Sequence, residues 1–487
     1  MSKHARIILA FTLLTLVFAQ AKSTLLPSLF VDQSKDWMKK IKNIPTYLGT
    51  KTPYQSNKEA EYEKPPANCK AVHIGGVHRH GSRFLSKERG MNHAESILKA
   101  ALEKDELSEK GINLLQWIYD AKKTFKAGHL SSQGEQELYE LGRRTYERFP
   151  EIFIANNRKI NLSATYKERT QHSRDRFQAG LMEAGNIDRS LFEIHTNTRC
   201  ADLFLRYFDS CQKFVDYRSD LFKKITSDKT AQHETNPENI QIRNRSLEQI
   251  FENYGEKSLN TKEAWALSDD IFQLCRQDYC LDSKTGEAKF CSLLSNDLKK
   301  IHFQKDNIES YYKIGPMADL VDPKYSKVSH AMACMAVEPL FTEIEKHVRG
   351  ERDANAAYLG FAHAETVTPL TDYFKLFDEN FDKWSASEVT PMGSNIEIVT
   401  YECTQEDQKS YKLKLFYNEK EHHFPIEECR KSYFCDWHLV QKFYTDQKIA
   451  HGTNSCSLQD WNAYCGNPVS DVPTCTGPYY IDHEEDE

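Results

Sequence analysis

The sequence predicts an α/β fold that carries a mostly helical insertion. Three observations support this. An alternating apolar segment at 72–74 is followed by helical periodicity, and a second strand-then-helix pattern spans 358–377. Between them, residues 185–320 are rich in charge and in helix-forming residues. Strands and helices that alternate along the chain are typical of an α/β core.

The first 21 residues predict a secretory signal peptide. A basic start precedes an apolar run at 7–18, and Ala19-Gln20-Ala21 offers small residues for cleavage. The run is shorter than the roughly 20 residues that a membrane-spanning helix needs. We therefore expect a chain of the secretory pathway, with secretion favoured and the ER lumen or a lysosome-like compartment as the alternatives. No transmembrane segment is expected in the mature chain, and the polar residues 22–66 are expected to form an arm on the domain.

The 13 cysteines agree with an oxidising compartment, where disulfides persist. Because the number is odd, at least one thiol should be unpaired or pair between chains. Cys334, inside a small apolar run, could be a buried free thiol or a disulfide partner. Asn161 and Asn244 begin acceptor sequons, which predict a glycoprotein. The disulfide connectivity and the oligomeric state stay open.

The net charge of −7 gives no global case for nucleic-acid binding. An acidic block at 482–487 contributes to it and reads as a solvated tail. An anionic substrate would therefore require positive charge that is concentrated locally at its site.

The elements are expected in the following order. The first strand ends at Gly75-Gly76, and apolar stripes predict helices around 97–102 and 114–119. Ser132 and Glu135 form a capping box for a helix that ends near 149–150. Residues 161–170 suggest a strand and loop, and two further strands follow at 396–401 and 411–417. We expect the α/β core to comprise 67–184 and 321–487, and the helical cap 185–320.

The densest chemical signal is His78-Arg79-His80-Gly81-Ser82-Arg83, directly after the first strand. Ligands of open α/β sheets bind beyond the carboxyl ends of strands. The arginine fork matches phosphate oxygens, and an imidazole nitrogen is a competent nucleophile toward phosphorus. The arginines should lower the pKa of His80 and keep it neutral. The simpler alternative is a solvated basic turn.

A metal site is the second interpretation of this segment. His73, His78 and His80 are close in sequence, and His363 with Glu365 could complete a zinc site. The neighbouring arginines would repel the cation, so we expect no metal and no cofactor.

Two further segments carry candidate residues. Arg169 opens the first, where Lys167 and Arg174 add positive charge that would guide an anion. The second follows the later strand: His363 could hold a phosphate oxygen, and Glu365 could protonate a departing alcohol oxygen. Glu365 could equally cap the start of its helix.

These segments, in this order, resemble the histidine acid phosphatase branch of the histidine phosphatase superfamily. The motif Arg-His-Gly-x-Arg stands at 79–83, and LSSQGEQELYELGRR at 130–144 is similar to a conserved helix of that branch. The segment ERTQHS at 168–173 is similar to the one that supplies a third arginine. Ordinary acid phosphatases carry His-Asp in the last motif, whereas the inositol polyphosphate phosphatase subfamily carries His-Ala-Glu, as at 363–365.

The resemblance implies a histidine-phosphatase-type α/β sandwich with an inserted helical cap, and a metal-independent reaction through a phosphohistidine. It makes His80 the nucleophile and Glu365 the acid. The implied phosphate-binding residues are Arg79, Arg83, Arg169 and His363, and Lys87 would bind substrate. The implied substrates are phytate, lower inositol phosphates and 2,3-bisphosphoglycerate. A broad-specificity secreted histidine acid phosphatase and a non-catalytic binder of phosphorylated ligands are the alternatives.

Overall fold

The computed structural model describes residues 48–467 except 57–60, 155–156, 200–201, 253, 255–258, 282–287, 315–324, 326–327, 379–382, 407 and 451–456. Its centre is a mixed sheet in the order β3-β2-β4-β1-β5-β6-β7, with β8 also paired to β6. The first four strands of that order are parallel, and the pairings from β1 to β5 onward are antiparallel. The strands are β1 (Cys69–Arg79), β2 (Ile160–Ala164), β3 (Phe192–Thr196), β4 (Ala357–Ala362), β5 (Asn395–Gln405), β6 (Gln408–Tyr417), β7 (Lys420–His422) and β8 (Cys435–Asp436).

The strand β1 is longer than the sequence predicts. It runs through Gly75 and Gly76 to Arg79, so the expected break at the glycines is wrong. A Cβ at Gly76 would lie only 2.3 Å from the carbonyl oxygen of Ile396 on β5. The glycine therefore permits close approach of the neighbouring strand and does not mark a turn.

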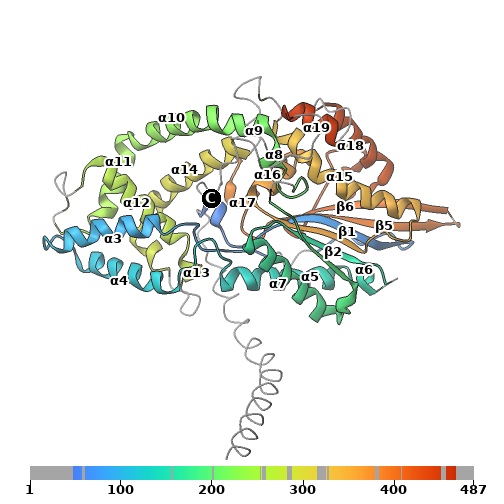
Figure 1. Cartoon of the computed structure of the whole chain (residues 1–487), viewed down its shortest axis with the longest axis horizontal. Helices are drawn as coiled ribbons and strands as arrows, with labels where there is room; N and C mark the ends of the chain where they lie inside the picture. The colour runs from blue at the N-terminus through green and yellow to red at the C-terminus, as the bar shows by residue number, and fades with distance from the viewer. Residues whose placement is uncertain are drawn as a thin grey trace, which may run out of the picture.

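Helices cover both faces of the sheet (Figure 1). Side chains of β5 alternate between the two cores: Ile396 and Ile398 face one, and Val399 and Tyr401 face the other. The first core contains α15 (Val328–Arg349), α16 (Ala364–Tyr373), α8 (Tyr207–Ser210), α9 (Gln212–Tyr217), α18 (Trp437–Ala450) and α19 (Leu458–Cys465). The second contains α5 (Ser132–Arg148), α6 (Pro150–Ile154) and α7 (Glu168–Gly185). The expected α/β sandwich is confirmed.

A separate hydrophobic core lies in the helical part, at the left of Figure 1. It joins α11 (Pro237–Leu247), α12 (Thr261–Cys275) and α14 (Asn296–Ile314) to α3 (Arg89–Leu102) and α4 (Glu109–Thr124). The helices α10 (Lys223–Glu234) and α13 (Asp278–Leu281) belong to the same stretch of chain, and α17 (Ala386–Val389) contacts α14.

This packing differs from the expected division of the chain in two places. The helices α3 and α4 fall within the range 67–184 that was assigned to the core, yet they pack on cap helices. The strand β3 falls within 185–320 and lies in the sheet. The apolar stripes of α3 and α4 show that each helix buries one face, but they cannot show against which partner.

Two helix starts and one expected loop differ from expectation. The side chain of Ser131, not Ser132, caps α5 by accepting the N–H of Gly134. The segment 168–173 is the first part of α7 and not a loop. The helix α16 begins at Ala364, three residues early, because His363 and Thr366 form the capping box.

The described disulfides are Cys69–Cys403, Cys211–Cys465, Cys275–Cys291 and Cys429–Cys435. Cys334 is also disulfide-bonded, and Cys280 is the free thiol within the described ranges. These bonds are consistent with the secretory pathway. Asn161 lies in β2, which is paired on both sides, so this sequon is not the surface loop that glycosylation favours.

The expected signal peptide, residues 22–47 of the expected arm and the acidic tail lie outside the described residues. Within the described part, no helix is both long and apolar enough to cross a membrane. The described end of the arm contacts both parts of the molecule. Leu48 is buried in the hydrophobic core of the helical part, and Tyr54 is buried in the core between the sheet and α5, α6 and α7.

Candidate active site

The candidate site lies where β1 and β4 end side by side. Arg79 pairs with Ala362 at the carboxyl ends of these parallel strands, and the N–H of His80 donates to the carbonyl of Ala362. The rings of His80 and His363 are therefore close, with centroids 5.7 Å apart. Two motifs nearly 300 residues apart in sequence meet because parallel strands end at one edge of a sheet.

His80 is buried, and its Nδ1 lies 2.9 Å from the carbonyl oxygen of Gly81. A carbonyl can only accept a hydrogen bond, so Nδ1 carries the proton and the lone pair is on Nε2. Burial, followed by the charges of Arg169, Arg79 and Arg83, lowers the pKa of His80 well below its usual value. The sequence indicated this direction correctly, although burial is a larger cause than the arginines. The neutral ring is the form that can attack phosphorus.

The three expected phosphate-binding arginines are buried around His80. Arg79 donates to the carbonyls of Thr50 and Thr390, which fix its guanidinium group. Arg83 donates to the carbonyl of Phe84 and to Ser86 Oγ.

Arg169 and His363 support each other. Nη2 of Arg169 lies 3.4 Å from His363 Nδ1, and His363 Nε2 lies 3.0 Å from Thr165 Oγ1. Since the guanidinium can only donate, Nδ1 of His363 accepts from it and Nε2 carries the proton. The ring of His363 thereby orients Arg169 beside the nucleophile.

Glu365 approaches the same space from the first turn of α16. It is buried, and its Oε1 lies 3.4 Å from the ammonium group of Lys313 on α14. The side chain therefore faces the cleft and is paired with a cation from the cap. The position of Lys313 in the site could not be predicted from the sequence, because the sequence of α14 does not show which of its residues face the sheet.

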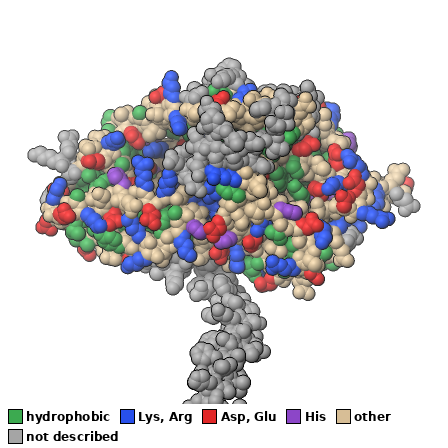
Figure 2. All heavy atoms as spheres, viewed as in Figure 1, with side chains coloured by type: hydrophobic (Ala, Val, Ile, Leu, Met, Phe, Trp, Pro, Cys, Tyr) green, Lys and Arg blue, Asp and Glu red, His purple; other side chains and the backbone are tan. Residues whose placement is uncertain are grey.

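A cleft of about 440 Å³ lies beside His80 and Glu365, whereas Arg169 and His363 are not among its lining residues. His80, Arg79, Arg83 and Glu365 line its core side, and Thr50 and Lys51 of the arm line it as well. Lysines and arginines outnumber aspartates and glutamates among the residues that line the cleft. Figure 2 shows cationic side chains gathered near the middle of the face that it draws. The remaining charged lining residues are Lys87, Arg89, Arg276, Lys313, Asp269, Asp306 and Glu309.

The three expected substrate-binding residues, Lys87, Lys167 and Arg174, lie in three different environments, and only Lys87 lines the cleft. Lys87 is exposed and lines the cleft. Lys167 is partly buried and lies over the ring of Tyr166, outside the cleft lining. Arg174 is buried and donates to the carbonyl of His195 at the edge of the sheet. The expectation that Arg174 faces the cleft is wrong, because its position on α7 directs it toward β3.

Of the histidines in the metal interpretation, His73 and His78 do not join His80 and His363. His73 packs against His347, and His78 packs against Phe177 and Phe361. Among the described residues, the group with metal-ligand spacing is Cys275, Asp278 and Cys291, whose two sulfurs form a disulfide. Neither arrangement supports a metal centre.

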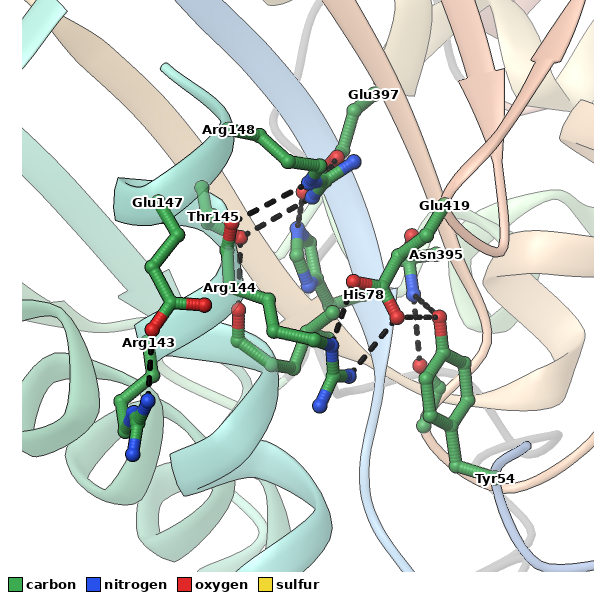
Figure 3. Close-up of polar contacts among 12 residues, drawn as sticks. Tyr54, His78, Arg143, Arg144, Thr145, Glu147, Arg148, Asn395, Glu397 and Glu419 are labelled. Carbon is green, nitrogen blue, oxygen red and sulfur yellow. Dashed lines mark hydrogen bonds and ion pairs between the residues drawn. The ribbon is translucent and has the colours of Figure 1, made fainter. Parts of the chain in front are cut away.

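Buried ion pairs hold α5 against β5 and the residues that follow β6 (Figure 3). Glu397 is fully buried between Arg148, 3.0 Å away, and His78, 3.4 Å away. Arg144 binds both carboxylate oxygens of Glu419, which also accepts from Tyr54. These pairs hold α5 against the antiparallel side of the sheet.

Glu397→Gln should destabilise the fold by about 3–5 kcal/mol near neutral pH, because it leaves the charge of Arg148 buried and unpaired. Burial raises the pKa of Glu397, but Arg148 and His78 outweigh it, and the pKa is lowered to about 2. Its ionisation therefore stabilises the fold above the unfolded-state pKa of about 4.3, and this contribution is lost as pH falls toward 2. In urea unfolding, the difference between wild type and variant should shrink over that range; a constant difference would contradict the ion pair.

The family model of the histidine phosphatase superfamily (branch 2) matches residues 72–418, which include both motifs at the ends of β1 and β4. The chain belongs to this superfamily. Multiple inositol polyphosphate phosphatase 1 of Gallus gallus is 25% identical and covers 85% of this chain and 93% of its own length. The Homo sapiens protein of the same name is 24% identical, with 78% and 82% covered.

Solved structures show the same histidine phosphatase fold. The Bifidobacterium longum multiple inositol polyphosphate phosphatase complex with inositol hexasulfate has a TM-score of 0.66 at 18% identity, covering 82% of this chain and 97% of that one. The phytase from D. castellii has a TM-score of 0.63 at 13% identity, with 90% and 92% covered. The chain is a phosphoric monoester hydrolase of this superfamily.

Proposed function

We propose that the chain hydrolyses phosphomonoesters of inositol polyphosphates, phytate and lower inositol phosphates among them, through a phosphohistidine at His80. The observation that carries this proposal is the cleft itself. The neutral nucleophile, Arg79 and Arg83 lie on its core side, and the arm and cap add further cations.

In the first step, His80 Nε2 attacks phosphorus and forms a P–N bond as the bond to the inositol oxygen breaks. The guanidinium groups of Arg79, Arg83 and Arg169 stabilise the charge of the transferring phosphoryl group, with His363 beside them. Glu365 gives a proton to the departing oxygen.

In the second step, water attacks phosphorus, the P–N bond breaks and inorganic phosphate leaves. Glu365 takes the proton of the attacking water and returns to its starting state. Two easier displacements thereby replace one difficult displacement.

The cations beyond the nucleophile favour a polyphosphorylated substrate over a simple phosphomonoester. Lys51, Arg276 and Lys313 line the cleft in addition to the arginines around His80. One phosphoryl group cannot occupy all of them, whereas a ring that carries several phosphates can. A phosphate that binds Lys313 would compete with its ion pair to Glu365. We also propose that the chain is exported, as its cysteine usage and apolar leader suggest.

The test is release of inorganic phosphate from phytate by the purified mature protein in EDTA, beside p-nitrophenyl phosphate. We expect metal-independent release, with higher kcat/KM on phytate. Release from the aryl phosphate alone would favour a broad acid phosphatase. Folded protein that releases phosphate from neither substrate would favour a binder.

A further inference from the structure

Glu137 on α5 is a buried carboxyl group that the reaction above does not use. Its side chain is 4% exposed, and its oxygens accept four hydrogen bonds. Oε2 accepts the backbone N–H of Ser82 at 2.7 Å, and Oε1 accepts Ser82 Oγ at 2.8 Å. Oε1 also accepts Gln133 Nε2 at 3.0 Å and the N–H of Tyr54 at 3.3 Å.

Ser82 lies in the loop between the nucleophile His80 and Arg83. Its carbonyl accepts both the N–H and the Oγ of Ser131, the cap of α5. The loop and the helix start touch so closely that a Cβ at Gly81 would lie 2.5 Å from the carbonyl oxygen of Gly134. Gly81 therefore serves this contact, and its φ is not in the left-handed region. The start of α5 thus fixes the loop from several directions.

The hydrogen bonds, as they are placed, suit an ionised carboxylate. The two backbone N–H groups and Nε2 of Gln133 can only donate, so a protonated oxygen would face a donor. Burial raises the pKa of Glu137 to about 7, and the hydrogen bonds from Ser82, Gln133 and Tyr54 act in the opposite direction. A buried charge without a cation among these four partners is costly to maintain, which points to a role beyond stability.

We propose that Glu137 is a positioning residue, which holds the 79–83 loop so that His80 and Arg83 face the phosphoryl group together. It touches neither substrate nor the reacting atoms. This inference rests on the proposed function, because the loop has a reactive geometry only if His80 is the nucleophile.

The test is Glu137→Gln, which keeps the shape of the side chain but replaces one acceptor by an NH₂ donor. In either orientation of the amide, this NH₂ faces an N–H of Ser82 or of Tyr54. We expect kcat to fall by roughly 10- to 100-fold on both phytate and p-nitrophenyl phosphate, since misplacement of the nucleophile slows both alike. The melting temperature should fall only modestly.

The matched control is Glu419→Gln. Glu419 is also a buried carboxylate that contacts α5 and Tyr54, but its described partners lie outside the 79–83 loop. We expect a lower melting temperature and a kcat within about twofold of wild type. A folded Glu137→Gln variant with wild-type kcat, or equal losses of kcat in the two variants, would overturn the inference.

A readout without substrate separates this inference from the proposed function. Cys280 Sγ lies 3.7 Å from the carbonyl oxygen of Arg83, and burial raises the pKa of this thiol to about 12. If Glu137 holds the loop, Glu137→Gln should speed labelling of Cys280 roughly tenfold, whether or not phytate is hydrolysed. Unchanged labelling would overturn the inference.

If Glu137→Gln does not fold, Ser82→Ala is the substitute. It removes the Oγ hydrogen bond and keeps the N–H donor, so kcat should fall about 3- to 10-fold with faster labelling of Cys280. A folded Ser82→Ala variant with wild-type values of both would equally contradict the inference.

Discussion

His80→Ala should lower kcat on phytate by at least about 10⁴-fold, because the first P–N bond cannot form. The arginines remain, so the variant should still bind inorganic phosphate, with little change in melting temperature. Rapid mixing of wild type with p-nitrophenyl phosphate, followed by an alkaline quench, should reveal a phosphohistidine that the variant lacks, because the P–N bond is stable to base and labile to acid.

His172→Ala is the matched control for this variant. His172 lies on α7 and is about half exposed, with its ring near Glu168. Its removal should leave kcat unchanged. Turnover by folded His80→Ala near the wild-type rate would remove His80 as the nucleophile and would require another group in the cleft.

Glu365→Gln should lower kcat on phytate by about 10²- to 10⁴-fold, since the inositol oxygen is a poor leaving group that needs a proton. The effect on formation of the phosphoenzyme from p-nitrophenyl phosphate should be much smaller, because nitrophenolate leaves without protonation. The two substrates must be compared in the pre-steady state, where the burst reports the first step alone.

Equal losses of burst rate on both substrates would contradict the acid role. Glu365 would then act on the geometry of the site, for example through Lys313, its ion-pair partner from the cap. Lys313→Met separates the two cases: it removes the pair and keeps the acid, so the dependence on the leaving group should persist.

Most elements of the α/β core could be predicted from local pattern. Alternation at 411–417 and the apolar segment at 358–362 identified β6 and β4, because strand side chains face two sides of a sheet. The end of β1 was misplaced, since a glycine pair reads as a turn unless the neighbouring strand is known. The partners of α3 and α4 were also misplaced, because an apolar stripe does not identify what it packs against.

The candidate chemistry of the site could be predicted from the sequence itself. Arg79 ends β1, His80 and Arg83 come directly after it, and His363 and Glu365 come directly after β4; this local order predicts a phosphate site. Only the tertiary structure decided the rest. It brought Lys51, Arg276 and Lys313 to the cleft, directed Arg174 away from it and placed Glu137 under the loop. These residues lie on elements whose local sequence predicts a helix or a coil, and their roles arise from contacts between distant segments that no local pattern encodes.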